Sequence, residues 1–213
     1  MSNKIISFDI ENSFGENSIC FGIDEAGRGC LAGPVVAACV WINRKKFPPE
    51  LLLKINDSKK ISEKKREEIF KELSLLPADT FMYEWSEVDA NIIDEINILQ
   101  ASLLAMKNAY LKLQKKMNVR PDIILIDGNK APDIEPTKTV ISGDAISYSI
   151  ATASIIAKVN KDRLLNKIGE EYPLYQFEKN KGYGTKLHLE ALEKFGISPY
   201  HRKTYAPVKK FIK

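Results

Sequence analysis

The stretch Ile19-Cys-Phe-Gly-Ile-Asp-Glu-Ala-Gly-Arg-Gly-Cys-Leu-Ala-Gly-Pro34 is the part of the sequence that decides the fold. An apolar run leads to two adjacent carboxylates, Asp24 and Glu25, and the chain then enters a loop with three glycines and a closing proline. A second apolar run follows at once. The pattern predicts a strand at 19–24, a tight functional loop, and a second strand at 35–42.

The two acids at the end of the first strand predict a cation. Burying a carboxylate is costly unless a positive charge compensates it, and a hard divalent metal ion is the obvious candidate. Neighbouring strand residues point to opposite faces, so Asp24 and Glu25 share one ion only if the strand ends at Asp24 and the backbone turns at Glu25. Gly27 and Gly29 permit such a turn. We therefore expect the strand to end at Asp24.

Size and composition predict one compact α/β domain. The chain has 213 residues, of which 44% are hydrophobic and 28% charged, as is ordinary for a globular protein. No apolar run is long enough for a membrane span, and the start lacks the apolar core of a signal peptide. We expect a cytoplasmic monomer with no membrane partner. The three cysteines lack metal-site spacing and are expected to be free buried thiols, and two histidines are too few to favour a zinc enzyme.

Charge is unevenly distributed along the chain. The net charge is only +4, but the segment from Lys179 to Lys213 carries nine Lys or Arg and two acids, so the remainder is slightly acidic. An acidic centre with a basic rim or tail suits a polyanionic partner.

Periodicity predicts an alternation of strands and helices after the first two strands. Residues 1–17 are expected to be a loosely held arm or a short leading strand. Further strands are expected at 80–85, along the apolar run that ends at Asp127, and at 139–142, with helices at 62–76, 96–117, 147–171 and 185–196. We expect one domain over 1–213, with a core at about 19–170 and a helical C-terminal part at about 171–213.

Four acids stand out by their predicted positions: Asp24 and Glu25 at one strand end, Asp127 at another, and Asp162 on a helix. Clusters of carboxylate oxygens suit magnesium or manganese. Two such ions about 4 Å apart activate water and stabilise the departing oxygen of a phosphodiester. Asp144 is an alternative member that the pattern does not exclude.

The predicted helix at 147–171 carries a polar stripe. Ser154, Lys158 and Asp162 are four residues apart and so lie along one side of it. This stripe either faces the acidic centre or is a solvated face with an ordinary lysine–aspartate pair.

The segment from Gly22 to Pro34 resembles the signature of ribonuclease HII, the type 2 ribonuclease H family. Its further motifs match in the same order over about 19–208, at Asp57-Ser58-Lys59, Leu125–Gly128, Ala153–Asp162, Lys181–Thr185 and His201–Val208. Lys161 and Thr204 stand where Arg and Ser are more common, and neither replaces a catalytic group.

The resemblance implies an RNase H-like fold, a mixed central β-sheet flanked by helices, with a helical C-terminal extension. It implies an endonuclease that uses Mg²⁺ or Mn²⁺ in a two-metal site. The substrates would be RNA–DNA hybrids and duplex DNA containing ribonucleotides, and the products would carry 5′-phosphate and 3′-hydroxyl ends. Ribonucleotide excision repair and DNA replication are the implied settings.

Matched by position, the family's site residues fall on named positions of this chain. Asp24, Glu25 and Asp127 would be metal ligands, and Asp162 the fourth catalytic carboxylate and a further ligand. Gly27-Arg28-Gly29 would face the ribose, whose 2′-hydroxyl distinguishes RNA from DNA.

The remaining matched positions concern the rest of the substrate. Tyr183 would pack on the deoxyribose beside the cleavage site and sense the RNA-to-DNA junction. The candidates for phosphate contact are Lys59, Lys181, Arg28 and Lys158. Contacts of this kind position a duplex without reading its sequence. His188 and Arg202 also match, and we interpret both as structural.

Three other readings compete with this one. Ribonuclease HIII has related motifs, but Asp-Glu-Ala-Gly-Arg-Gly is the HII form, and the extra N-terminal domain usual in HIII is not expected at this length. Junction resolvases and integrase-like enzymes share clustered acids but are not expected to combine Gly-Arg-Gly with Tyr183. A non-catalytic hybrid-binding module is disfavoured because all four carboxylates are present.

Overall fold

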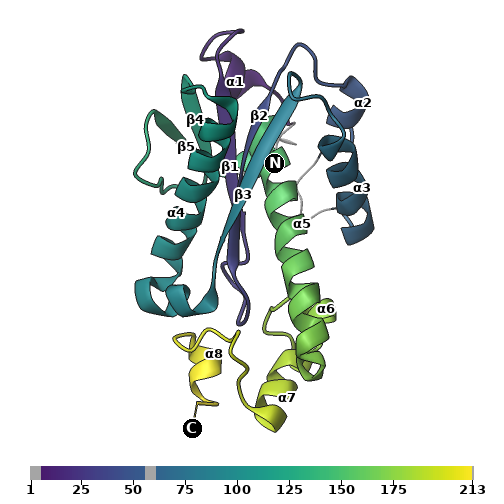
Figure 1. Cartoon of the computed structure of the whole chain (residues 1–213), viewed down its shortest axis with the longest axis vertical. Coiled ribbons are helices and arrows are strands. Elements are labelled where there is room, and N and C mark those ends of the chain that lie inside the picture. Colours follow the sequence, from purple (N-terminus) through teal and green to yellow (C-terminus); the bar gives the residue numbers. More distant parts are fainter. Residues whose placement is uncertain (1–5, 56–60, 213) are drawn as a thin grey trace, which may run out of the picture.

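A computed structural model describes residues 6–55 and 61–212, and these form a mixed five-stranded sheet flanked by helices (Figure 1). The strand order is β3-β2-β1-β4-β5. The strands are β1 (Cys20–Ala26), β2 (Val35–Ile42), β3 (Phe81–Val88), β4 (Ile123–Asp127) and β5 (Thr137–Val140). β1 pairs antiparallel with β2, and β2 with β3, whereas β4 is parallel to both β1 and β5. The predicted mixed sheet is confirmed.

The prediction that the first strand ends at Asp24 is wrong. β1 continues through Asp24, Glu25 and Ala26, which pair with Ala38, Ala37 and Val36 of β2. The apolar residues of β2 extend the pairing beyond the acids, and the turn comes only at Gly27, with φ +97°. Because strand residues alternate, the Asp24 and Glu25 side chains start from opposite faces of β1. At this strand end both carboxylates are nevertheless close enough to Asp127 to be repelled by it, so the two acids can serve one site without the predicted turn at Glu25.

Helices cover both faces of the sheet (Figure 1). The α-helices are α1 (Asp9–Asn12), α2 (Pro49–Leu52), α3 (Glu63–Ser74), α4 (Ala90–Met117), α5 (Tyr148–Glu171), α6 (Phe177–Asn180), α7 (Lys186–Phe195) and α8 (Ala206–Lys209), with 3₁₀ turns η1 (Gly143–Ala145) and η2 (Pro173–Tyr175). The side chains of Ser62 and Thr185 accept hydrogen bonds from the first turns of α3 and α7, as their sequence positions predict.

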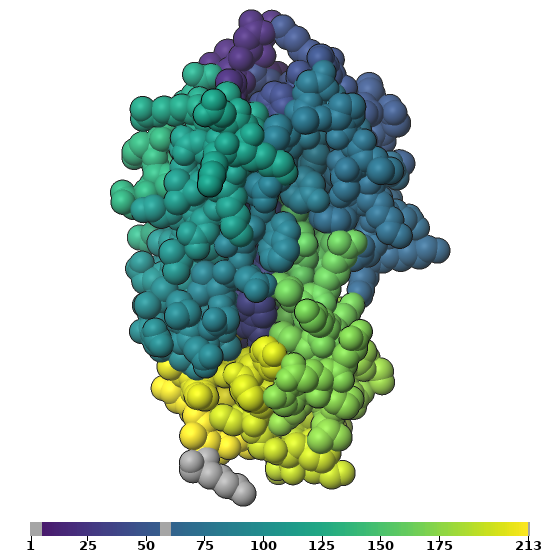
Figure 2. All heavy atoms as spheres, viewed as in Figure 1, coloured from purple at the N-terminus to yellow at the C-terminus, as the bar shows by residue number. Residues whose placement is uncertain are grey.

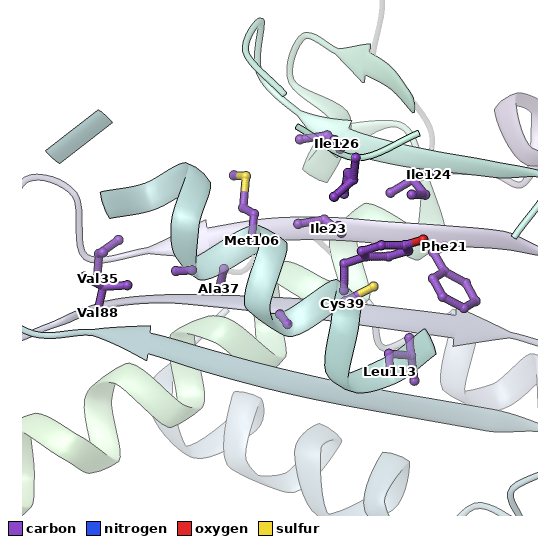
Figure 3. Close-up of a cluster of buried hydrophobic side chains, with 14 of the residues drawn as sticks. Phe21, Ile23, Val35, Ala37, Cys39, Val88, Met106, Leu113, Ile124 and Ile126 are labelled. Carbon is purple, nitrogen blue, oxygen red and sulfur yellow. The ribbon is translucent and has the colours of Figure 1, made fainter. Parts of the chain in front are cut away.

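The face of the sheet under α4 holds a large apolar core (Figure 3). Phe21 and Ile23 of β1 are fully buried there, with Ile124 and Ile126 of β4 beside them. Burying one such side chain stabilises the fold by about 1.5–3 kcal/mol. β1 thus enters the core with alternate residues, and its other residues face α5.

Gly22 lets α5 lie directly on β1. A Cβ atom at Gly22 would lie 2.4 Å from the carbonyl carbon of Ser149 in the first turn of α5. Real side chains do not approach backbone so closely, so any larger residue would force the helix away from the sheet. The small-residue helix predicted at 147–171 is confirmed as α5.

The N-terminal arm is not loose over 9–12. Glu11 of α1 is fully buried, and its Oε1 accepts from Ser147 Oγ at 2.7 Å and from Ser149 N at 3.1 Å. A carboxylate at this position satisfies donors at the N-terminus of α5 and complements the helix dipole. The sequence did not predict this cap, because α1 and α5 are more than a hundred residues apart.

The segment after α5 packs into a cluster of its own at one end of the molecule (Figures 1 and 2). Phe177, Leu192 and Val208 are fully buried in it, against Leu165 of α5 and Leu31 of the loop after β1. This cluster therefore attaches the C-terminal helices to the glycine-rich loop.

Two expectations from composition concern the described residues as a whole. Cys20, Cys30 and Cys39 are free and buried, as predicted. Within 6–55 and 61–212, no helix is both long and apolar enough to span a bilayer.

Candidate active site

Three of the predicted acids lie at adjoining strand ends. Asp24 and Glu25 are on β1 and Asp127 ends its parallel neighbour β4, one residue beyond the Ile23–Ile126 pair. Burial raises the pKa of Asp24 well above its usual range, and repulsion from Glu25 and then Asp127 adds to the effect. The three carboxylates are therefore close enough to disfavour one another's charge.

Each β1 acid has its own hydrogen-bond partner. Asp24 is 4% exposed, and its Oδ1 accepts from the backbone N–H of Glu25 at 2.7 Å. A hydrogen bond with Ser154 of α5 lowers the pKa of Asp24, but not enough to offset burial. Burial also raises the pKa of Glu25, although Arg28 opposes this through an ion pair of 3.2 Å.

Asp127 is held by a turn that the sequence did not identify. Its Oδ1 accepts from the backbone N–H of Gly143 at 2.7 Å. A Cβ at Gly143 would lie 2.4 Å from Cδ1 of Ile150 and 3.3 Å from Oδ1 of Asp127, so glycine permits this approach. Asp144, the alternative acid, is buried in the same turn.

Asp162, the fourth predicted acid, forms ion pairs with three basic side chains. Its carboxylate lies 2.9 Å from Lys158 Nζ, 2.8 Å from Lys161 Nζ and 3.6 Å from Arg66 Nη2. Burial opposes ionisation, but Lys161 and then Lys158 outweigh it and lower the pKa of Asp162. The polar stripe on α5 therefore faces inward, and Asp162 is ionised.

These carboxylates fit a hard divalent ion by chemistry but are not preassembled around one. Within 6–55 and 61–212, no three Asp, Glu, His or Cys side chains are arranged as a metal site. The donors are nevertheless all carboxylate oxygens, which Mg²⁺ and Mn²⁺ prefer. Glu25 and Asp127 repel a negative charge on Asp24, and a bound divalent cation would offset this repulsion.

The Gly27-Arg28-Gly29 loop is fixed from the C-terminal segment. The carbonyl oxygen of Arg28 accepts from Arg202 Nη1 at 2.9 Å and from the Tyr205 hydroxyl at 2.7 Å. A Cβ at Gly27 would meet the Pro34 carbonyl at 3.0 Å, whereas one at Gly29 would meet nothing within 4 Å. Gly29 thus leaves open space where a ligand can reach the backbone.

Arg202 is a structural residue in this geometry, as interpreted from the sequence. It is fully buried, and its Nε donates to the Gly33 carbonyl at 3.0 Å in addition to the bond to Arg28. One guanidinium therefore holds both ends of the loop after β1.

Tyr183 lies beside the cations of Asp162. The residue is 39% exposed, and its ring centroid lies 4.8 Å from Lys161 Nζ and 5.4 Å from Lys158 Nζ. The Lys161 ammonium also donates to the Lys181 carbonyl at 3.0 Å. Lys161 thus connects Asp162 with the Tyr183 loop, a role that the sequence did not reveal beyond its position next to Asp162.

Among the predicted phosphate contacts, Lys181 already has partners in this structure. Lys181 Nζ lies 2.8 Å from Glu63 Oε1 and 2.6 Å from Asn166 Oδ1, so its ammonium is engaged between α3 and α5. Lys59, with Asp57 and Ser58, lies outside the described residues.

The sequence of this chain is similar to known proteins over most of its length. Residues 21–208 match the family model for ribonuclease HII. The chain belongs to the ribonuclease HII family. Over an alignment of 215 positions it is 48% identical to the ribonuclease HII of Endomicrobium trichonymphae, and the match covers 100% of this chain and 97% of that one. To the ribonuclease HII of Caldicellulosiruptor bescii it is 47% identical over 199 residues, covering 92% and 91%.

Solved structures share the fold. The ribonuclease H2 of Pyrococcus horikoshii superposes with a TM-score of 0.70 at 25% identity, covering 90% of this chain and 96% of that one. A structure of Bst-RNase HIII in complex with Mn²⁺ gives a TM-score of 0.75 at 17% identity, covering 91% and 68%. The predicted RNase H-like fold and ribonuclease HII family are therefore both confirmed.

Proposed function

We propose that this ribonuclease HII family member hydrolyses the RNA strand of RNA–DNA hybrids and nicks duplex DNA on the 5′ side of embedded ribonucleotides. The products would carry 5′-phosphate and 3′-hydroxyl ends. The observation that carries the proposal is the meeting of Asp24, Glu25 and Asp127 at adjoining ends of β1 and β4, next to the glycine-rich loop. The proposal is supported by sequence identities of 47% and 48% to two ribonucleases HII over almost the whole chain.

The cofactor we propose is Mg²⁺ or Mn²⁺, held by Asp24, Glu25 and Asp127 with Asp162 as the fourth carboxylate. Such a pair of ions, when bound, provides an activated water and stabilises the departing oxygen of the phosphodiester. A related RNase HIII is described in complex with Mn²⁺, which supports a divalent ion in this fold. Asp162 would join the ligand set after losing part of its contact with Lys158 or Lys161.

The protein's own groups would position the substrate. Arg202 and Tyr205 hold the Arg28 carbonyl, so the backbone of the loop meets the ribose already in place. Preorganised polar groups need no rearrangement during the reaction and therefore favour it. The open space at Gly29 lets a 2′-hydroxyl approach the backbone, and Tyr183 would stack on the neighbouring deoxyribose.

The decisive experiment uses a DNA duplex with one internal ribonucleotide, with and without Mg²⁺ or Mn²⁺. Metal-dependent nicking 5′ to the ribonucleotide is expected. Cutting only within longer RNA tracts would leave a narrower hybrid nuclease, such as a ribonuclease HIII-like enzyme. Binding without cutting under both metals would indicate a non-catalytic hybrid-binding module. The family match favours the HII activity over both alternatives.

Cytoplasmic location, a monomeric state and a single domain over 1–213 stay predictions from the sequence. Size-exclusion chromatography with light scattering measures the oligomeric state directly.

A further inference from the structure

The chain's only two histidines form a buried pair in the C-terminal cluster. His188 of α7 is fully buried and His201 is 1% exposed, and their Nε2 atoms lie 2.9 Å apart. Each ring has a second partner at Nδ1. His188 Nδ1 lies 2.9 Å from the Tyr183 carbonyl oxygen, and His201 Nδ1 lies 2.9 Å from the backbone nitrogen of Ser198 and 2.8 Å from its hydroxyl oxygen, which can also donate to it.

These partners determine where each proton lies. The Ser198 N–H is a donor, so His201 Nδ1 must accept and the proton of that ring is on Nε2. That Nε2–H donates to His188 Nε2, which leaves the His188 proton on Nδ1, where it donates to the Tyr183 carbonyl. The two rings are thus neutral, opposite tautomers in one directed chain of hydrogen bonds.

The surroundings of the pair favour the neutral forms. Phe177 packs edge-on against His188, and Tyr175 packs against His201. Burial lowers the pKa of both rings, for His201 to about 4, with repulsion from His188 as the second cause. Tyr175 is the titratable group packed on the pair, and its hydroxyl donates to the Gly196 carbonyl.

The hydrogen-bond chain and the backbone of His201 together link the two proposed substrate contacts. At one end is the backbone of Tyr183. At the other end is the backbone of Ser198. The link to the loop is made by the backbone of His201, which forms a bridge with Ala32, and by the next residue, Arg202, which binds the Arg28 carbonyl. The pair therefore spans the distance between Tyr183 and the Gly27-Arg28-Gly29 loop.

We infer that His188 and His201 are positioning residues that fix Tyr183 relative to the Gly27-Arg28-Gly29 loop. They do not touch the reacting atoms. Their role is to keep the ring that would contact the deoxyribose at a set distance from the backbone that would contact the ribose, and so to support cleavage at an RNA-to-DNA junction. The inference rests on the proposed function for its consequence but not for its geometry.

The first test needs no substitution. With two histidines in the chain, ¹⁵N labelling of histidine gives two ring systems to assign by NMR. We expect one ring protonated on Nδ1 and the other on Nε2 at pH 7, with neither titrating near the ordinary value of about 6.5. Two rings in the same tautomer, or a ring that titrates normally, would overturn the inference.

The second test asks whether His188 acts through Tyr183. His188→Phe keeps an aromatic ring against Phe177 and removes both hydrogen bonds. We expect it to slow nicking at a single embedded ribonucleotide roughly tenfold, as loss of a buried hydrogen bond would, and to slow cleavage of long hybrids less. In a Tyr183→Ala background the same change should add less than about twofold, because positioning a missing ring has no further effect.

A rescue variant separates positioning from folding. In His188→Asn the side-chain amide nitrogen can occupy the place of Nδ1 and keep the bond to the Tyr183 carbonyl. We expect this variant to recover most of the junction preference. Independent, multiplying losses in the double variant, or no recovery with Asn, would contradict the inference. If wild-type enzyme cuts neither substrate, the proposed function fails, while the NMR result still decides the geometry.

Discussion

The ammonium of Lys161 lies 2.8 Å from Oδ1 of Asp162 although the lysine side chain is fully buried. The second polar contact of the Lys161 ammonium, the Lys181 carbonyl, belongs to the loop before Tyr183. A buried charge with two polar partners and the Tyr183 ring beside it is strongly constrained in position, so this lysine connects α5 to the loop.

Lys161→Met should destabilise the protein by about 3–5 kcal/mol, because removing one member of a buried ion pair leaves the other poorly compensated. Chemical denaturation monitored by circular dichroism measures this. Lys161→Arg is the matched control, since it keeps the charge and can reach the same carboxylate, and it should retain most of the stability. Equal stability of the Met variant and wild type would mean that Lys158 and Arg66 suffice for Asp162.

Asp24→Asn should abolish cleavage while leaving hybrid binding intact, because it removes a carboxylate ligand and no basic side chain. Without metal the variant should be at least as stable as wild type, since burial and the neighbouring acids disfavour a charge at Asp24. Added Mg²⁺ or Mn²⁺ should raise the melting temperature of wild type more than that of the variant. Cleavage at the wild-type rate would show that the metal assignment is wrong.

Gly27→Ala and Gly29→Ala should separate folding from substrate contact. Gly27 has φ +97° and a Cβ there would lie 3.0 Å from the Pro34 carbonyl, so alanine should cost about 1–3 kcal/mol of stability. A Cβ at Gly29 meets nothing within 4 Å, so its alanine variant should melt like wild type yet cut more slowly. Full activity in a normally folded Gly29→Ala variant would remove this residue from the proposed ribose contact.

Acid should weaken the fold through the histidine pair before it affects Asp162. The folded-state pKa of His201 is lowered to about 4, so below the ordinary value of about 6.5 the unfolded chain binds the extra proton. Stability is therefore full above about pH 6.5 and falls as the pH drops towards 4, by roughly 3 kcal/mol.

Denaturation series at several pH values, compared with His201→Gln, test this. The variant lacks the titrating ring and should show a flatter dependence between pH 6.5 and 4. Asp162, whose pKa is lowered by its lysines, should contribute its own loss only at still lower pH. Identical slopes for both proteins would exclude His201 as the source.

The acids of the site were predictable because strand endings are readable in the sequence. Asp24, Glu25 and Asp127 each follow an apolar run and precede a glycine turn, and parallel neighbours bring such ends together. The end of β1 was predicted two residues too early, because its pairing with Ala37 and Val36 of β2 is a long-range interaction that local periodicity does not report.

The supporting contacts were not predictable for the same reason. Glu11 caps a helix more than a hundred residues away, Arg202 binds a carbonyl at Arg28, and the proton positions of His188 and His201 depend on backbone groups on separate segments. Sequence spacing identifies which residues carry chemistry. It does not identify which buried polar groups hold those residues in place, since such partners come together only when distant segments of the chain fold against each other.

Gly22 contributes no functional group, yet it determines how close the two halves of the site can be. Asp24 follows two residues later on the same face of β1, while Ser154 and Asp162 lie farther along the helix whose first turn rests on Gly22. Adding a single methyl group at position 22 would shift α5 outward and lengthen every distance between the strand acids and the helix acid at once. A residue that touches no substrate would therefore affect the geometry of the whole site, through spacing alone.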